Sequence, residues 1–425
     1  MTGVFIIGLF AVLMAVGVPV AGALGLSALI YMAVMTSIDP ILVVQQMING
    51  SDKFTLLAIP FFIMAGGFME RGGISSRIVQ FAKSVFSPLP GGLALVVIGS
   101  SMIFASMTGA GAATAAAIGS IMLPAMRREK YDDDFGCALQ ASAGIFGPLI
   151  PPSILMVLYG VATNTSVGDM LLSGVFPGLF LGVVMAGVTI SLCLKNGYRG
   201  EGRLSFREIA SSFVHAFFAL LTPVIILGGI YTGIFTATEA AAVAALYSLI
   251  AGGLIYRELT WAKILDIAFK SCKLAAGILF IVAATQAFGW VLTRERIPQL
   301  VGEFFSNISS NPVIFLFAVS ILLLIAGCFL DPVPAIMIFT PILAPPAMKY
   351  GINPIHFGVV MVVALCIGLI TPPVGMNLFV VSSLSKRPIH AIVPKLWPFI
   401  ISMIAGLVAV ILFPGLSLWL PEKLG

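Results

Sequence analysis

The sequence predicts an all-α polytopic membrane protein with an inverted-topology repeat, two re-entrant helical hairpins and two helices broken at Pro-Pro pairs. Three observations predict this fold. Of the 425 residues, 60% are hydrophobic and only 9% are charged, whereas soluble domains contain about 25% charged residues. Many apolar runs are long enough to cross a bilayer. Pro-Pro motifs also recur at corresponding positions in the two halves of the chain.

The composition argues against several other classes of protein. The net charge of +5 is too small to indicate nucleic-acid binding. The five cysteines are odd in number and lie in or beside apolar runs, which is typical of buried thiols rather than a disulfide framework. The three histidines are far apart, and no metal-binding, P-loop, nucleophile-elbow or dinucleotide motif is present. We expect no cofactor and no transition metal.

Ten apolar stretches are expected to cross the membrane, because a core about 30 Å thick requires about 20 residues of helix. The first begins at Gly3 with no basic segment before it, so it is interpreted as a span rather than a cleaved signal. Two of the ten are interrupted by Pro-Pro. The continuous spans are 3–18, 20–37, 54–69, 170–194, 213–235, 238–256, 274–292 and 396–414, and the interrupted ones are 135–164 and 355–385.

Two further apolar stretches are predicted to form re-entrant hairpins. Residues 84–126 contain no charged side chain, but the small and polar residues Ser106–Gly111 divide them into arms of 13 and 15 residues. At 1.5 Å per residue these arms reach only about 20–22 Å, which is less than the thickness of the membrane core. Residues 304–330 and 332–348, separated at Asp331-Pro332-Val333-Pro334, are predicted to form the second hairpin.

The distribution of basic residues supports this path. If each hairpin returns to its own side, one face of the membrane carries five of the 22 Lys and Arg residues, and the other face carries the remaining 17. The five are Lys53, Arg294, Arg296, Lys349 and Lys423. The positive-inside rule makes the more basic face cytoplasmic. The N-terminus is therefore expected outside, and the two hairpins are expected to open to opposite sides.

The two halves of the chain resemble each other at an offset near 222 residues. Phe135-Gly136 recurs as Phe357-Gly358, and Gly147–Pro152 corresponds to Gly368–Pro373 after one insertion or deletion. The first unit is expected to cross the membrane an odd number of times, so the second begins from the opposite side. Inverted repeats of this kind are typical of secondary transporters rather than of most membrane enzymes.

The helix breaks and the hairpin tips supply the candidate binding groups. A Pro-Pro pair interrupts a helix and frees backbone carbonyls, so a half-helix C-terminus faces a half-helix N-terminus. The first suits a small cation such as sodium, and the second suits a carboxylate. The candidate residues are Ser106, Thr108, Gly109 and Gly111 at the first tip, Asp331 at the second, and Ser153, Gly375 and Asn377 in the downstream half-helices.

Several of these signals also have a purely structural interpretation. Asp331 precedes a proline and is equally expected to be a helix N-cap. Glu239 follows Thr236 by three residues, which is the spacing of a capping box, although an ionisable group near the membrane can be functional. Residues 132–134, all aspartate, are expected to cap the following helix. The small residues 109–117 also fit close helix packing.

Four strings resemble the large membrane subunit of tripartite ATP-independent periplasmic (TRAP) transporters: Gly147–Ser153, Thr371–Asn377, Thr238–Ala242 and Tyr131–Asp134. The resemblance covers nearly the whole chain, and the two Pro-Pro strings together with the hairpins are its most specific part. The chain departs from the family pattern at Pro332 and Val333, where a Thr-rich tip is usual, and at Ala364 and Ala237.

The resemblance implies an elevator-type secondary transporter in a bacterial inner membrane, with a periplasmic N-terminus, that imports organic acids with sodium as the coupling ion. The implied acids are dicarboxylates, sialic acid or related carboxylates and sulfonates. The implied partners are a small membrane subunit of about four helices, a periplasmic substrate-binding protein and the lipid membrane. The implied sodium-binding residues are Ser106, Gly109, Gly111, Gly147, Pro148, Pro151, Asp331, Leu369, Thr371 and Pro372, and the substrate-binding residues are Ser106, Thr108, Ser153, Gly375 and Asn377.

The resemblance also implies a division of the chain into a scaffold and a transport domain. The transport domain comprises residues 84–169 and 304–390, which contain the hairpins and broken helices. Residues 1–83 and 170–303 form the scaffold and its connecting arms, and 391–425 form a C-terminal helix. No basic residue lies deep in the transport segments, so an anionic substrate is expected to be held by helix N-termini, hydroxyl groups and sodium, unless Arg294 or Arg296 reaches it.

Other functions are considered beside this one. A stand-alone ion:carboxylate symporter would share the fold but would need no binding protein. A polytopic membrane enzyme would need convergent catalytic side chains within the membrane, and neither an Asp pair nor a Ser/His constellation is present. A channel fits less well, because two half-helix sites indicate occlusion rather than a continuous pore. The sequence therefore predicts a secondary transporter and not an enzyme.

Overall fold

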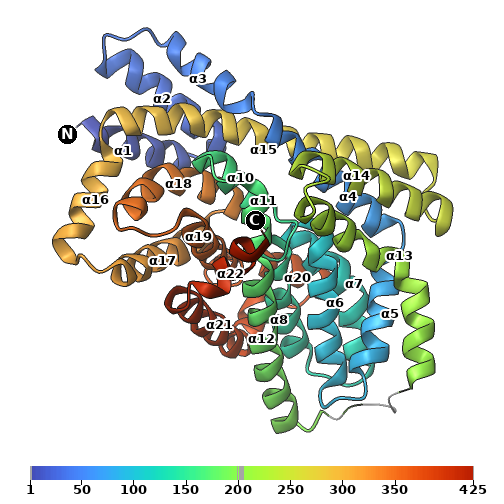
Figure 1. The fold of residues 1–425 in the computed structure, drawn as a ribbon. Helices are drawn as coiled ribbons and strands as arrows, with labels where there is room; N and C mark the ends of the chain where they lie inside the picture. The colour runs from blue at the N-terminus through green and yellow to red at the C-terminus, as the bar shows by residue number, and fades with distance from the viewer. Residues whose placement is uncertain (1, 199, 201–204, 425) are drawn as a thin grey trace.

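The computed structural model describes residues 2–198, 200 and 205–424 (Figure 1). Within these residues the chain is helical throughout, and no strand occurs in them. Eight helical stretches are long and apolar enough to cross a membrane by length and composition. The prediction of an all-α polytopic fold is thus confirmed. Of the basic residues used above to orient the chain, Arg199 and Arg203 lie outside the described residues.

The N-terminal quarter consists of helices that lie along the edge of the molecule. Two apolar helices are followed by a helix, Ile41–Ser51, that the sequence did not predict, because its 11 residues are too few to span a membrane. Near this region lies α15, which packs along α2, α3 and α4 (Figure 1). The elements are α1 (Thr2–Ala15), α2 (Val20–Met35), α3 (Ile41–Ser51), η1 (Phe54–Leu57), α4 (Ala58–Arg71) and α5 (Ile74–Phe86).

The next segment contains the first predicted hairpin and the first broken helix. Helices α6 (Gly92–Thr108) and α7 (Gly111–Arg128) pack against each other and are joined by two residues. We call them the first helix pair and call Gly109-Ala110 its tip. The broken helix follows as α8 (Asp133–Ala143), α9 (Phe146–Leu149) and α10 (Ile154–Thr163). We call residues 150–153 the first break.

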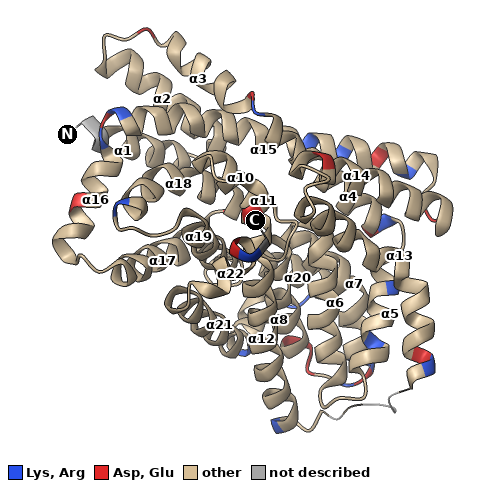
Figure 2. Ribbon diagram, in the orientation of Figure 1, with Lys and Arg blue, Asp and Glu red and all other residues tan. Residues whose placement is uncertain are grey.

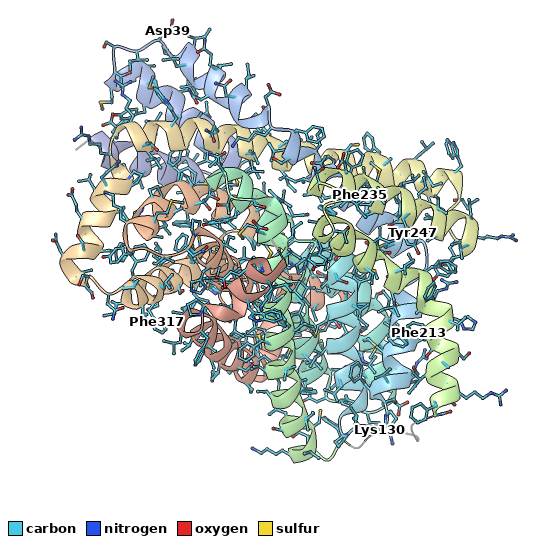
Figure 3. The ribbon with its side chains drawn as sticks, viewed as in Figure 1. Asp39, Lys130, Phe213, Phe235, Tyr247 and Phe317 are labelled. Atoms are coloured by element: carbon cyan, nitrogen blue, oxygen red, sulfur yellow. The ribbon has the colours of Figure 1, made fainter. Side chains whose placement is uncertain are left out.

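The middle of the chain returns to the edge of the molecule. Its helices are α11 (Val167–Ser173), α12 (Val175–Lys195), α13 (Phe206–Tyr231), α14 (Ala237–Ile250), the π-helical turn Ala251–Ile255, and α15 (Trp261–Arg294). Helix α14 packs against α4 and α13. We refer to α2, α3, α4, α14 and α15 as the frame. Large apolar side chains such as Phe213 point outward from this part of the molecule (Figure 3), as a lipid-facing surface requires.

Helix α15 begins earlier than the sequence predicted. The expected span started at residue 274, but the helix starts at Trp261, where the Thr260 hydroxyl accepts a hydrogen bond from Lys263 N at 3.4 Å. Its 34 residues correspond to about 51 Å, which exceeds the membrane core by about 20 Å. The first turns carry charged side chains (Figure 2), so hydropathy placed the start of the helix too late.

The second half repeats the order of the first. After α16 (Ile297–Ile308), the second helix pair consists of α17 (Pro312–Phe329) and α18 (Pro332–Lys349), with Leu330-Asp331 as its tip. The predicted arm 304–330 is in fact divided at residues 309–311, because Asn311 caps a new helix through Val313 N. The second broken helix is α19 (Pro354–Gly368) and α20 (Met376–Ser385), and we call residues 369–375 the second break.

The two helix pairs and the two broken helices share one large hydrophobic core with α12 and α21 (Ile389–Leu412), to which α4, α5, α14 and α15 also contribute buried residues. Fully buried residues from both halves contribute to it, including Phe104, Phe146, Tyr159, Phe357 and Phe399. A smaller core lies between α1, α2, α3 and α15. The last helix, α22 (Gly415–Leu424), packs on α11 and α19. The candidate residues therefore lie in the large core, beside the frame.

Candidate functional site

The tip of the first helix pair is in backbone contact with the first break. Gly109 ends α6 with a φ of 65°. A Cβ at Gly109 would lie 2.7 Å from Pro152 O, and a Cβ at Gly147 would lie 2.4 Å from Ala110 O. Real Cβ atoms do not approach so closely, so both positions require glycine. The structure thus places the first tip, Gly109-Ala110, against Gly147 and Pro152.

The hydroxyl groups of the first tip form hydrogen bonds within the helix pair. Ser106 Oγ donates to Ile103 O at 2.7 Å, and Thr108 Oγ1 lies 3.2 Å from Thr114 Oγ1. Both Ser106 and Thr108 are buried. On its other side the tip faces the frame, because a Cβ at Gly66 of α4 would lie 3.2 Å from Thr108 Cα. The tip therefore lies between the first break and α4.

The first break is completely enclosed. Ser153 Oγ donates to Pro148 O and accepts a hydrogen bond from Met156 N, so its side chain both caps α10 and binds a carbonyl that the break frees. Residues 151–153 are all buried, and the peptide bond between Pro151 and Pro152 is cis. The hydroxyl of Ser153 is thus occupied by the chain itself.

The second break is more open than the first. The peptide bond between Pro372 and Pro373 is also cis, but Pro373 and Val374 are exposed. Thr371 Oγ1 donates to Ile367 O at 2.8 Å, and Gly375 turns the chain with a φ of 58°. These residues lead the chain to Asn377, which is fully buried.

Asn377 connects the two halves of the chain. Its Nδ2 donates to Ala141 O, at the end of α8, at 3.1 Å, and its backbone N donates to Leu369 O at 3.1 Å. Its Oδ1 is buried and has no hydrogen-bond partner in the described part of the chain. A buried amide oxygen without a partner costs about 1–3 kcal/mol. This oxygen is therefore available for a ligand.

A second oxygen approaches the same point. A Cβ at Gly111, the first residue of α7, would lie 3.2 Å from Asn377 Oδ1 and 3.1 Å from Gly144 O. The first tip, the first broken helix and the second break therefore converge at Gly111. The sequence assigned Gly111 and Asn377 to separate roles in separate halves, and it held no signal that they meet. Oxygen atoms that converge beside interrupted helices suit a hard monovalent cation such as sodium.

The tip of the second helix pair packs differently. Gly327 of α17 and Gly368 of α19 are in such close contact that a Cβ on Gly368 would lie 2.6 Å from Gly327 Cα. Asp331 Oδ1 accepts a hydrogen bond from Val333 N at 2.9 Å, so Asp331 caps α18 as one of its two interpretations predicted. Its side chain is exposed, and no hydrogen bond joins it to residues 369–373 among the described residues.

Two cavities lie between the tips and the frame. The smaller, of about 190 Å³, is lined by the first tip, α4, α10 and α15, and includes Thr108 and Glu70. The larger, of about 800 Å³, lies between the second tip, the start of α2 and α15, and includes Asp331. Arg294 and Arg296, which the sequence offered as partners for an anion, line neither cavity. Arg294 instead lies over the ring of Trp290, 5.9 Å from its centroid.

The other predicted caps are present. Thr236 and Glu239 form a capping box at the start of α14, in which Thr236 N donates to Glu239 Oε2 at 2.8 Å. Asp132 caps α8 by accepting a hydrogen bond from Asp134 N at 2.9 Å. These acidic residues therefore have structural roles at the positions that the sequence indicated.

The acidic segment 132–134 also joins the two halves, which the sequence did not predict. Asp134 forms two hydrogen bonds of 2.7 Å with Arg387, and Asp132 pairs with Lys395 at 2.9 Å. Burial disfavours the charge on Asp132, but the Lys395 ammonium and the Asp134 amide keep its pKa below the ordinary value of 3.8. The partners are about 250 residues apart in the sequence, so no local pattern revealed them.

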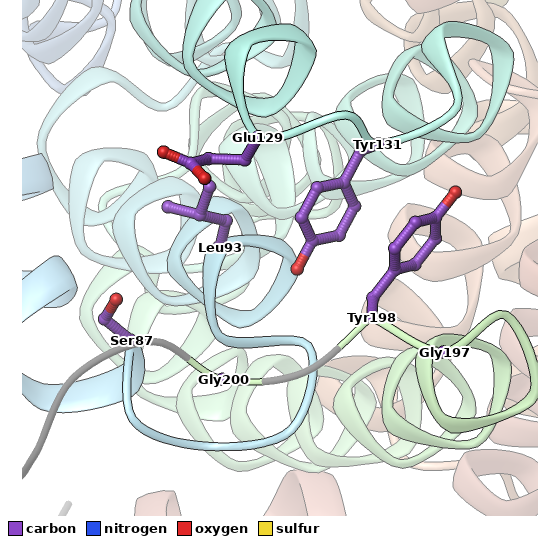
Figure 4. A pocket seen from close by; sticks show the side chains of 7 residues that line it. All are labelled: Ser87, Leu93, Glu129, Tyr131, Gly197, Tyr198 and Gly200. Atoms are coloured by element: carbon purple, nitrogen blue, oxygen red, sulfur yellow. The ribbon is translucent and has the colours of Figure 1, made fainter.

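A small pocket of about 260 Å³ lies beside this acidic segment (Figure 4). The rings of Tyr131 and Tyr198 stack with centroids 4.2 Å apart, and Tyr198 Oη accepts a hydrogen bond from Asp132 N at 3.0 Å. Glu129 and Ser87 line the same pocket. The pocket lies at the base of the first helix pair, away from the tip, so it is separate from the candidate site.

Comparison with known proteins gives the family. Residues 7–416 match the family described as tripartite ATP-independent periplasmic transporter, DctM component. The chain is 40% identical over 406 residues to the sialic acid TRAP transporter large permease protein SiaM of Vibrio cholerae, covering 96% of this chain and 95% of SiaM. It is 43% identical over 380 residues to the C4-dicarboxylate TRAP transporter large permease protein DctM of Pseudomonas aeruginosa, covering 89% of each.

Two further comparisons concern chain organisation and fold. The chain is 39% identical over 416 residues to the isethionate TRAP transporter permease protein DctMQ of Oleidesulfovibrio alaskensis, covering 97% of this chain but 65% of DctMQ. Its structure resembles the crystal structure of the YdaH transporter of Alcanivorax borkumensis, with a TM-score of 0.67 over 88% of this chain and 87% of YdaH. At 13% sequence identity, the second likeness concerns the fold alone.

Proposed function

The chain belongs to the tripartite ATP-independent periplasmic (TRAP) transporter family as its DctM component, the large permease subunit, and from this premise we propose that it imports organic acids together with sodium by an elevator movement. It is a multi-pass membrane transporter subunit and not an enzyme. The coupling ion, the substrate, the movement and the partners are proposals, and each has its own support.

Sodium coupling is supported by the unpaired oxygen of Asn377, and this observation carries the proposal. Asn377 Oδ1 is buried and has no partner in the described residues, and both it and Gly144 O approach Gly111, the residue that follows the first tip. Sodium ligands in transporters with interrupted helices are typically carbonyl oxygens of the broken segments. A sodium ion at this point would contact both halves of the chain. Because Gly111 directly follows the first tip, binding of the ion would depend on where that tip lies.

An organic acid as substrate is supported by the relatives. The names of SiaM, DctM and DctMQ specify sialic acid, C4-dicarboxylates and isethionate, all of which carry a carboxylate or a sulfonate. A negatively charged substrate gains from a bound sodium ion nearby. The substrate is therefore proposed to lie in the space between the two tips, beside the sodium site.

The elevator movement is supported by the space between the tips and the frame. Cavities of about 190 Å³ and about 800 Å³ lie between the frame and the tips of the two helix pairs. The pairs are proposed to be re-entrant hairpins of an inverted repeat, with the N-terminus in the periplasm. Their contacts with the frame include the small residue Gly66 against Thr108, where a smooth surface permits sliding.

Two partners are proposed, a small membrane subunit and a periplasmic substrate-binding protein. This chain covers 65% of DctMQ, so that relative has room for a second, smaller unit within one polypeptide. The family description itself specifies a tripartite and periplasmic system. We place the complex in a bacterial inner membrane on the same basis. A stand-alone symporter is the alternative that the following experiment distinguishes.

The test is uptake by the reconstituted complex. The chain and its small subunit would be inserted into liposomes, and labelled succinate or N-acetylneuraminate would be added with the matching periplasmic binding protein under an inward sodium gradient. We expect uptake to require both sodium and the binding protein. Uptake that continues when potassium replaces sodium, or when the binding protein is omitted, would contradict the proposal.

A further inference from the structure

The two cavities share one wall, and that wall is basic. Lys270 and Leu274 of α15 line both the smaller cavity at the first tip and the larger cavity at the second tip. Lys273, one turn away from Gly277 on the same helix, also lines the larger cavity. Lys270 is therefore next to a ligand in either cavity.

The charges around this wall leave a positive excess on the frame. Asp266 pairs with Lys270 at 2.9 Å and also with Arg71, so one carboxylate is shared by two basic groups. Lys273 forms no ion pair within the described part of the chain. The acidic residue Glu70 lines the smaller cavity. The frame side thus carries three basic and two acidic groups, and Asp331 of the second tip lines the larger cavity from the opposite side.

The tips contribute no basic group of their own. Residues 84–126 carry no charged side chain, and Asp331 is the only charged residue between 304 and 348. A negatively charged ligand in the cavities can therefore find a cationic partner only on α15. Lys270 and Lys273 are both exposed, so their ammonium groups can reach an anion that enters the larger cavity.

We propose that Lys270 and Lys273 form the frame's half of the substrate site and bind the carboxylate or sulfonate of the transported anion. This proposal rests on the proposed function and names residues for it that the sequence placed outside the site. Lys270 Nζ uses one of its donors for Asp266 and keeps others for the ligand. Lys273, which has no paired acid, attracts the anion on the larger-cavity side. The anion then lies between a fixed cationic wall and the two movable tips.

The experiment uses the full complex and a thiol reporter that does not depend on transport. Cys272 is the one exposed cysteine among the described residues, and the other four are buried, so Cys272→Ser removes the accessible thiol. Val333→Cys then places a reporter in the larger cavity. The rates of its modification by negatively and positively charged methanethiosulfonates are compared, with and without 10-fold excess succinate or N-acetylneuraminate. The variants Lys270→Gln, Lys273→Gln and both together are tested.

The matched control is Lys263→Gln, which removes a lysine on the same helix that donates to Glu258 O and lines neither cavity. We expect the double variant to lower the ratio of negative-reagent to positive-reagent rates by about fivefold, to abolish protection by the organic anion, and to raise the substrate concentration for half-maximal uptake. Lys263→Gln should change none of these.

Each contrary outcome overturns a specific statement. An unchanged rate ratio and unchanged protection in the double variant would refute the role of the lysines, whatever the uptake result. Loss of protection when phosphatidylglycerol is added to phosphatidylcholine liposomes would assign the lysines to a lipid phosphate and refute the substrate assignment. If the wild-type complex takes up neither acid with sodium, the proposed function fails, while the thiol ratios still decide whether the cavity attracts anions.

Discussion

Replacing Asn377 by alanine should remove the sodium response of the protein without unfolding it. The substitution deletes the unpaired Oδ1, which relieves a cost of about 1–3 kcal/mol. It also deletes the 3.1 Å hydrogen bond from Nδ2 to Ala141 O, which costs a similar amount because the carbonyl at the end of α8 loses this side-chain donor. The two effects offset each other. The free energy of unfolding in the absence of sodium should therefore change by less than about 2 kcal/mol.

The sodium-dependent part of the stability should behave differently. An ion present at 100 times its dissociation constant stabilises the state that binds it by about 2.7 kcal/mol. For a chain of 425 residues this corresponds to a rise in melting temperature of about 3 °C. We expect this rise in the wild-type protein when sodium replaces potassium at constant ionic strength, and we expect Asn377→Ala to abolish it.

The assay is thermal unfolding in detergent, followed by tryptophan fluorescence. Gln140→Ala is the matched control, because Gln140 is also a buried amide with one hydrogen bond, from Nε2 to Ala115 O at 3.3 Å, and an unpaired oxygen. Its neighbour is Gly119 rather than Gly111, so Gln140→Ala should retain the sodium response. An equal sodium-induced rise in Asn377→Ala and the wild-type protein would refute the assignment of the ion to this oxygen.

Three further predictions concern the tip, the frame and the ion pairs. Gly147→Ala should destabilise the protein by about 1–3 kcal/mol and abolish uptake, because the added methyl group would collide with the backbone of the first tip. The control Gly187→Ala, which has open space around it, should do neither. Equal melting temperatures of the two variants would contradict this. Lys53 Nζ donates to Val161 O and to Asn164 Oδ1 at the end of α10, and it must release both if the transport domain moves. Lys53→Met should therefore increase thiol labelling of α10 cysteine variants from the side that Lys53 faces, and unchanged labelling would argue against a breakable contact. Because the pKa of Asp132 is lowered in the folded protein, its pairing with Lys395 stabilises the fold above the ordinary carboxyl pKa of 3.8, and this stabilisation is lost as the pH falls below that value. The melting temperature of the wild-type protein should therefore fall more steeply between about pH 5 and pH 3 than that of Asp132→Asn. Parallel curves for the two proteins would refute this.

The helices and their breaks could be predicted because local chemistry determines them. Pro-Pro pairs interrupt helices wherever they occur, and the apolar runs specify the spans by length alone. The caps at Asp331 and Thr236 were also predictable, since a cap depends on residues within one turn. Helix α3 was not predicted because its 11 residues are too few to span a membrane. The early start of α15 was not predicted because the charged residues of its first turns lower the average hydropathy.

The composition of the candidate site could be predicted only in part. The sequence identified Gly109, Gly111, Gly147 and Asn377 as site residues, but it assigned each to its own half of the chain. The convergence of Gly111 with Asn377 depends on the packing of α7 against α20, which no local pattern encodes. Lys270 was passed over for a related reason, because a charged residue near the end of a predicted span is ordinarily a membrane-surface residue.

Sodium coupling can be measured as the simultaneous entry of labelled sodium and labelled organic acid into liposomes that contain the complex, with the wild-type protein and with Gly111→Ala. A methyl group at Gly111 would lie 3.1 Å from Gly144 O and 3.2 Å from Asn377 Oδ1, and would occupy the space proposed for the ion. We predict that the wild-type complex takes up both labels together and that Gly111→Ala loses both while remaining folded. Entry of the acid without sodium in the wild-type complex, or coupled entry that is unchanged in Gly111→Ala, would contradict the account.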